Sequence, residues 1–221
     1  MYKYIVDHIP RNTPNNRRPG IAMTANTLTV HTTGNPDSSA RNERGWLTNP
    51  ENDRTASYHI VIDEYEAIEV LPLNEVAWHA GDGNGDGNRR SIGIEICESG
   101  NYSKTLENAV DLIAKMLKER GWGIDRLRRH YDWSGKICPR LMYDGGKWTA
   151  WERFKLMIEK ELEGMEKPKQ PDYAGHWAEA SIRRVMDSGI MNGRGNGFAP
   201  NEPITRAEIA VVVDRLLKKQ G

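Results

Sequence analysis

The stretch Ser91-Ile92-Gly93-Ile94-Glu95-Ile96-Cys97 alternates in polarity and is rich in β-branched residues, which predicts a buried strand. Three other segments share this strand composition and are separated by turn signals: 27–33, 58–63 and 67–71. Apolar residues recur at helical spacing over 106–117 and again over 151–162. Strands and helices mixed over about 160 residues predict an α/β domain whose sheet is covered by helices.

The overall composition indicates a soluble globular chain and excludes several classes of protein. The 221 residues include 31 Lys plus Arg and 31 Asp plus Glu, and the mean hydropathy is -0.72. A net charge of zero with no basic run argues against a nucleic-acid partner. No apolar stretch approaches the roughly 18 residues of a membrane span, and the start, Met1 to His8, becomes polar too early for a signal peptide. We therefore expect no nucleic-acid partner and no membrane association.

Residues 164–171 have the composition of a linker, because they are polar and charged and include two prolines. This predicts one domain over 1–163 and a second over 172–221. The tail contains two helical segments around a Gly/Asn-rich turn, and Thr205 and Glu208 have the spacing of a capping box. About fifty residues make a marginal core, so we expect the tail to lean on the first domain, on a copy of itself or on a ligand.

Histidine and cysteine side chains provide candidate metal ligands. A catalytic zinc site uses three protein ligands and one open position. His31, His130 and Cys138 form one such set, with His59 and His79 in reserve, and spacing alone does not choose between them. Cys138 lies in a turn-rich segment beside a lysine, which favours a thiolate. Cys97, within the strand composition of 91–97, is interpreted as a small core residue instead.

Two charged residues have the chemistry that an activated water needs. Glu95 suits a base, and Lys136, two residues before Cys138, suits a donor to a developing oxyanion. Glu95 faces either solvent or a cleft, and periodicity alone favours solvent.

Several ordered motifs carry a family resemblance: His31, Tyr58-His59, Trp78-His79-Ala80-Gly81 with Asn88, Ser91 to Glu95, and His130 through Lys136-Ile137-Cys138-Pro139. Together they resemble the type 2 N-acetylmuramoyl-L-alanine amidases, the family that includes phage lysozyme-like amidases and peptidoglycan recognition proteins. The resemblance covers about the first 160 residues and is strongest for Bacillus prophage endolysins and related autolysins.

This resemblance implies a central mixed sheet flanked by helices, with zinc held by His31, His130 and Cys138. The implied reaction is hydrolysis of the peptidoglycan amide that joins N-acetylmuramic acid to L-alanine. Glu95 matches the proposed base and Lys136 the residue thought to stabilise the oxyanion.

The resemblance also suggests roles for residues around the cleft. Tyr58 matches a tyrosine that lies near the metal in some relatives, or it packs as a strand aromatic. His79 and Asn88 match a cleft-wall motif, which implies either substrate contact or loop architecture. Trp78, like Trp46 and Trp133, suits stacking on sugar or peptide, although a tryptophan often packs instead. The competing interpretation is a non-catalytic protein that only binds peptidoglycan or anchors to the wall.

The tail resembles a single, small all-α S-layer homology module through five segments: Asp172, His176-Trp177-Ala178, Gly189-Ile190, Gly197 to Pro200 and Ile204 to Glu208. Such modules generally attach proteins to secondary cell-wall polysaccharide, often pyruvylated. The resemblance suggests that Arg206 contacts the acidic sugar and that Trp177 and Arg194 line the site. Asn196 replaces a common aspartate, and the family usually works as three modules. Either one module binds weakly, or chains trimerise.

The implied location is the extracellular wall of a Gram-positive host. A substrate outside the membrane and no signal peptide imply release through a holin-type lysis pore, as for a phage endolysin, or another export route. A phage endolysin and a host autolysin both remain open.

Overall fold

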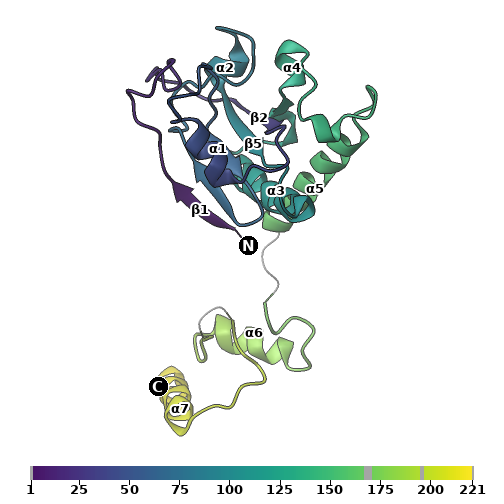
Figure 1. Cartoon of the computed structure of the whole chain (residues 1–221). Helices are drawn as coiled ribbons and strands as arrows, with labels where there is room; N and C mark the ends of the chain where they lie inside the picture. The colour runs from purple at the N-terminus through teal and green to yellow at the C-terminus, as the bar shows by residue number, and fades with distance from the viewer. Residues whose placement is uncertain (1, 167–170, 195–196, 221) are drawn as a thin grey trace. The chain divides into compact units, whose positions relative to one another are not determined.

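The computed structural model describes residues 2–166, 171–194 and 197–220, and the chain divides into two compact units, 1–166 and 167–221 (Figure 1). Helix α5 (Thr149–Glu166) continues to the end of the first unit. It therefore includes residues 164–166, which the composition assigned to the linker. Residues 167–170 of that linker, and Asn196, lie outside the described residues.

The first unit is built on a six-stranded mixed sheet in the order β1-β4-β3-β5-β2-β6. Its strands are β1 (Lys3–Val6), β2 (Thr27–Thr32), β3 (Ile60–Ile62), β4 (Glu66–Glu69), β5 (Ser91–Ile96) and β6 (Leu127–Arg129). Only β3 and β4 pair antiparallel; the other neighbours are parallel. The predicted mixed sheet flanked by helices is confirmed. The sequence missed the two edge strands, because β1 is largely exposed and β6 has only three residues, two of them arginines.

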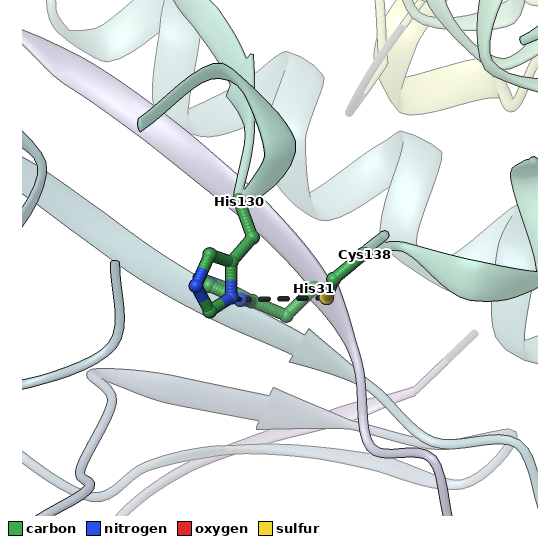
Figure 2. Close-up of side chains that lie close together, drawn as sticks. All are labelled: His31, His130 and Cys138. Carbon is green, nitrogen blue, oxygen red and sulfur yellow. Dashed lines mark hydrogen bonds between the residues drawn. The ribbon is translucent and has the colours of Figure 1, made fainter. Parts of the chain in front are cut away.

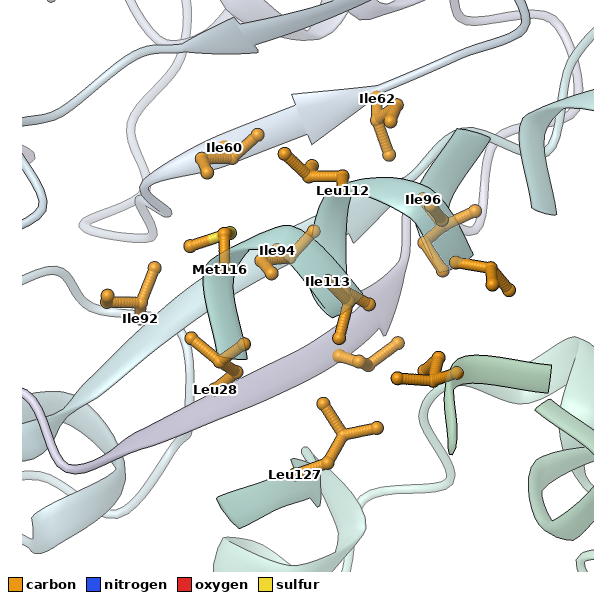
Figure 3. Close-up of a cluster of buried hydrophobic side chains, with 14 of the residues drawn as sticks. Leu28, Ile60, Ile62, Ile92, Ile94, Ile96, Leu112, Ile113, Met116 and Leu127 are labelled. Atoms are coloured by element: carbon orange, nitrogen blue, oxygen red, sulfur yellow. The ribbon is translucent and has the colours of Figure 1, made fainter. Parts of the chain in front are cut away.

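One face of the sheet is apolar and lies under two long helices, α3 (Tyr102–Glu119) and α5, which pack against each other. Side chains of four strands meet the helix side chains there (Figure 3). The large buried residues of these strands are Leu28, Val30, Ile60, Ile62, Ile92, Ile94, Ile96 and Leu127. Each such side chain contributes about 1.5–3 kcal/mol through removal from water, so this face is the main source of stability.

The opposite face carries the polar residues of the same strands. Parallel pairing of β2 with β5 places Thr29 beside Gly93 and His31 beside Glu95. Because successive side chains of a strand point to opposite faces, these residues lie on the side away from α3 and α5. A smaller apolar cluster that includes Ala40 of helix α1 (Ala40–Trp46) lies on this side.

The second unit contains two helices, α6 (Glu179–Asp187) and α7 (Arg206–Gln220). The predicted capping box is present: the Thr205 amide donates to the Glu208 carboxylate over 2.7 Å, and the Glu208 amide donates to Thr205 Oγ1 over 3.2 Å. Several apolar side chains of α7 are exposed: Ile209, Val211, Val213 and Leu217. Among the helices of the described residues, none is both long and apolar enough to cross a membrane.

Candidate metal centre and cleft

Three residues far apart in sequence converge on the polar side of the sheet: His31, His130 and Cys138 (Figure 2). Their ligand atoms all lie within 4.8 Å of one another, and all three side chains are buried. His31 belongs to β2, whereas His130 follows β6, which pairs with β2. Strand pairing therefore brings together histidines that are 99 positions apart.

Cys138 reaches the group through a tight reversal. After His130 comes a single helical turn, α4 (Tyr131–Ser134), which ends at Gly135 with a φ of 76°. Glycine adopts this left-handed conformation without the steric penalty of a side chain. The chain then turns back, and the Tyr131 amide donates to the Cys138 carbonyl over 3.1 Å.

Two of the three donor-atom distances are close to those expected around a tetrahedral metal ion. His31 Nδ1 is 3.1 Å from His130 Nδ1 and 3.7 Å from Cys138 Sγ. Usual zinc bond lengths in tetrahedral geometry predict about 3.3 Å between two nitrogen ligands and about 3.6 Å between nitrogen and sulfur. The chemistry of two imidazoles and one thiol also suits a borderline-soft metal.

Burial sets the charge of these ligands. It lowers the pKa of His31 well below its ordinary value and that of His130 to about 4, so both rings are neutral at neutral pH and able to bind a metal. Burial also raises the pKa of Cys138 to about 12, and the nearby Lys136 lowers it by less. Lys136 and the neighbouring polar groups therefore do not by themselves hold Cys138 as a thiolate, because desolvation dominates. A thiolate here needs a stronger cation, as a bound metal provides.

Glu95 lies next to the metal-binding group and lines the cleft, so the periodicity-based expectation that it faces solvent was wrong. Both faces of β5 are covered, and alternation therefore does not identify an outer side. Glu95 Oε1 lies 4.0 Å from His31 Nδ1, and its buried Oε2 has no hydrogen-bond partner among the described residues. Burial, followed by the charge of Glu43, raises the pKa of Glu95 to about 8.

A cleft of about 710 Å³ opens over this group. Its lining includes all three ligand residues, together with Glu95 and the exposed Lys136. One wall consists largely of the end of α1 and the loop that follows it, with the following lining residues: Trp46, Glu51, Asn52, Asp53, Arg54, Ala56 and Ser57.

A buried arginine holds this wall, and the sequence analysis did not identify it. Arg17 is fully buried and donates to the carbonyls of Leu47 over 2.7 Å and Arg54 over 3.0 Å, and also to that of Asn52. Its partners are backbone carbonyls at least 30 positions away in the sequence. Because every residue has a backbone carbonyl, no sequence pattern identifies these partners. The guanidinium therefore ties the loop together from beneath.

The remaining predicted residues of the cleft are held by specific hydrogen bonds. Tyr58 lines the cleft, but its hydroxyl donates to the Glu43 carbonyl over 2.9 Å. Trp78 forms part of the wall, and its indole nitrogen donates to the Asn16 carbonyl over 2.9 Å. Trp133 is not among the residues that line the cleft. Its indole nitrogen donates to Thr29 Oγ1 over 2.9 Å.

His79 and Asn88 occupy different positions. His79 lines the cleft and also contacts His31, with 3.0 Å between His79 Nδ1 and His31 Nε2. Asn88 is buried in helix α2 (Asp86–Arg90), where its side-chain oxygen accepts from the amides of His79 and Ala80, each over 2.8 Å. Of the two roles left open for Asn88, these contacts support loop architecture.

In the second unit, Trp177 is 91% exposed, and Arg206 is exposed at the start of α7. Arg194 pairs with Glu202 over 3.2 Å and with Glu208. A cavity of about 470 Å³ in this unit is lined partly by Arg194, but neither Trp177 nor Arg206 belongs to that lining. Of the three predicted sugar-binding residues, this cavity, as far as the described residues form it, therefore includes only Arg194.

Comparisons with known proteins agree with this geometry. The profile of the N-acetylmuramoyl-L-alanine amidase family matches residues 21–141, and that of the S-layer homology domain matches residues 171–210. The chain is 44% identical to the amidase XlyB of Bacillus subtilis (strain 168) over 168 residues, which is 74% of this chain and 51% of XlyB. It is 45% identical to the amidase CwlA of the same organism over 145 residues, which is 63% of this chain and 51% of CwlA. The chain thus spans about half the length of these curated relatives.

Solved structures extend the likeness to the fold. The catalytic domain of XlyA matches with a TM-score of 0.64 at 43% identity, covering 71% of this chain and 99% of that domain. A mutant endolysin from Bacillus subtilis matches with a TM-score of 0.65 at 42% identity, covering 72% of this chain and 99% of that one. The sheet has the fold of these amidase domains and carries a candidate metal site, His31, His130 and Cys138. The chain belongs to the N-acetylmuramoyl-L-alanine amidase family.

Proposed function

We propose that this protein is a zinc-dependent peptidoglycan hydrolase that cleaves the amide between N-acetylmuramic acid and L-alanine. The observation that carries the proposal is the buried His31-His130-Cys138 group beside Glu95 on the floor of a cleft, in a chain of the amidase family. Zinc is the metal that this set of two nitrogen donors and one sulfur donor suits best in a hydrolase.

The chain's own residues carry out proton transfer and charge stabilisation. When bound, zinc supplies Lewis acidity and lowers the pKa of water at the site. Glu95 accepts the proton of the attacking water and passes it to the amine of L-alanine as the C–N bond breaks. A cation beside His31 favours the carboxylate form of Glu95, which burial alone disfavours. Lys136 donates to the oxyanion that develops on the scissile carbonyl.

The other predicted residues serve the cleft. Trp78 offers an aromatic wall to sugar or peptide. Tyr58 is engaged by the carbonyl of Glu43, which supports a role in holding the wall rather than in proton transfer. His79 contacts the proposed ligand His31. Asn88 holds the loop between His79 and α2 by accepting from the His79 amide.

We propose further that residues 172–221 target the catalytic domain, residues 1–163, to the wall through secondary cell-wall polysaccharide. The match to the S-layer homology domain supports this role, and the exposed Trp177 and Arg206 are accessible to a polymer. Attachment raises the local concentration of the enzyme at its substrate. The exposed apolar side of α7 is compatible with the proposed trimerisation.

The deciding experiment incubates purified Gram-positive cell walls with the protein, with and without a chelator. New amino groups of L-alanine and new reducing sugar ends are followed together. Amino groups without reducing ends, abolished by the chelator and restored by zinc, are the expected result. Binding without any cleavage would instead make the protein a non-catalytic wall-binding protein, and reducing ends would mean that a glycosidic bond is cut. Walls stripped of secondary polysaccharide test the targeting role, because binding to them is expected to fall.

A further inference from the structure

His79 lies directly behind His31, on the side of the ring away from the other two metal-binding residues. His31 Nε2 is 3.0 Å from His79 Nδ1, and the two rings are perpendicular with centroids 5.1 Å apart. The other ring nitrogen of His79, Nε2, lies 3.1 Å from the carbonyl oxygen of Ser91. His79 therefore bridges a proposed ligand and the backbone of β5.

These contacts determine which nitrogen of each ring carries the proton. A carbonyl oxygen only accepts, so His79 Nε2 must donate to Ser91. In a neutral imidazole the second nitrogen, Nδ1, then has a free lone pair and accepts from His31 Nε2. His31 Nδ1 in turn has its lone pair free, and this is the atom that faces His130 and Cys138.

We propose that His79 is a positioning residue, which holds His31 in the Nε2-protonated tautomer and thereby directs the lone pair of Nδ1 toward the metal. This inference rests on the proposed metal function of His31. Partners of this kind commonly orient metal-ligating histidines and affect metal affinity. Here the partner is a second imidazole, whose own proton is fixed by the main chain of the sheet.

The surrounding chain is shaped to admit the His79 ring. Gly93 lies beneath it in β5, and a Cβ atom at this position would be 2.7 Å from His79 Cγ. Glycine weakens a strand interior, and a close neighbour is a common reason for its presence there. Asn88 fixes the other end by accepting from the His79 amide over 2.8 Å. Backbone and side chain of His79 are thus both held in place.

The test compares three variants. His79→Leu removes the acceptor while retaining a buried side chain of similar volume. His79→Asn places an amide oxygen near the position of Nδ1 and restores an acceptor. The matched control is His59→Leu, because His59 is also buried and its ring packs edge-on against His79, with centroids 5.8 Å apart, but its nitrogens bond only to backbone. They donate to the Glu75 carbonyl over 2.8 Å and accept from the Gly93 amide over 2.9 Å, so this variant changes the packing around His79 without removing the acceptor for His31.

Two measurements are made on each variant, after its fold is verified by its amide NMR spectrum. Long-range nitrogen–proton NMR of the metal-free protein reports the tautomer of His31. Competition with a chromogenic chelator reports the dissociation constant for zinc. We expect His79→Leu to lose the fixed tautomer and to bind zinc about 10–100-fold more weakly. His79→Asn should stay within about fivefold of the parent, and folded His59→Leu should match the parent.

A folded His79→Leu that keeps both the His31 tautomer and the parent's zinc affinity would overturn the inference. Equal losses in His79→Leu and His59→Leu would also overturn it, because they would reflect a general effect of core polar groups. Failure of the parent itself to bind zinc would contradict the proposed function instead. In that case the tautomer measurement, which needs no metal, still decides whether His79 orients His31.

Discussion

The two faces of the central sheet are both buried, but they are buried in different ways. Beneath α3 and α5 the strands present isoleucine, leucine and valine, whose contribution depends on shape and apolar area. On the other face the same strands present histidine, threonine and glutamate, and most of these polar groups have a specific hydrogen-bond partner. Changes on the first face should alter stability, and changes on the second should alter chemistry.

Glu95 and Ile94 provide the sharpest version of this comparison, because they are neighbours in β5 that point to opposite faces. Glu95→Gln should retain zinc and lower kcat by about 10²–10⁴-fold, since it removes the proton acceptor without changing side-chain volume. Its thermal stability should not fall, because the parent buries a carboxylate oxygen that has no partner among the described residues. Amine release from cell walls, zinc content and a thermal melt measure the three quantities. Full activity in the variant would remove Glu95 from the mechanism.

Ile94→Ala should have the reverse signature. Ile94 is fully buried beneath α3, so truncation should lower the free energy of unfolding by about 2–5 kcal/mol. The folded fraction should keep its zinc and its kcat. Urea unfolding measures the loss, and Ile94→Val, expected to lose only about 0.5–1.5 kcal/mol, is the graded control. A variant that kept its stability but lost activity would contradict the division between the faces.

The same contrast explains which parts of the molecule the sequence could predict. Strands β2 and β5 were predicted because a long run of β-branched residues indicates a buried strand, whichever elements cover the two faces of the sheet. The face on which Glu95 lies was not predicted correctly. Alternation of polar and apolar residues shows which face of a strand is exposed only when one face of the sheet meets water. Strand β6 was also missed, although its pairing with β2 is what brings His130 to His31.

The metal-binding set shows the limit of spacing as evidence. His59 and His79 are as buried as the three ligand residues, and only family resemblance separated them in the sequence. In the structure, their ring nitrogens are engaged by backbone atoms or by His31, so neither joins the metal-binding group. The difference lies in hydrogen-bond partners, which a sequence does not display.

Arg17 tests the wall of the cleft and should have an intermediate effect. Arg17→Met keeps the apolar stem but leaves the carbonyls of Leu47 and Arg54 without this donor, which should lower stability by about 1–3 kcal/mol. Because the loop forms one wall of the cleft, KM should rise about tenfold while kcat changes by less than about threefold. Steady-state kinetics on soluble muropeptides separates the two constants. A fall in kcat with an unchanged KM would mean that Arg17 acts on the metal site rather than on the wall.

The stability of the metal-free protein should also depend on pH. Burial holds the pKa of His79 at about 3 and those of His59 and His130 at about 4, below the 6.5 of an exposed histidine. Between pH 6.5 and 4 the unfolded chain therefore takes up protons that the folded chain does not, and stability falls as the pH falls. Glu95 acts in the opposite sense. Its pKa is raised from 4.5 to about 8, so its contribution to stability is lost as the pH rises through that interval.

Below pH 6.5 the four buried histidines, which include His31, outweigh Glu95 and Glu43, whose pKa values are raised. Above pH 6.5 Glu95 still loses its proton, so the stability of the metal-free protein should be greatest near pH 6.5. Urea unfolding in chelator from pH 4 to 8 measures the curve. Glu95→Gln should remove the decline above the maximum and leave the decline below it. Ile94→Val should lower the whole curve without changing its shape, since an apolar side chain binds no proton. A curve whose shape changed in Ile94→Val, or stayed the same in Glu95→Gln, would show that the titration does not arise from the polar face.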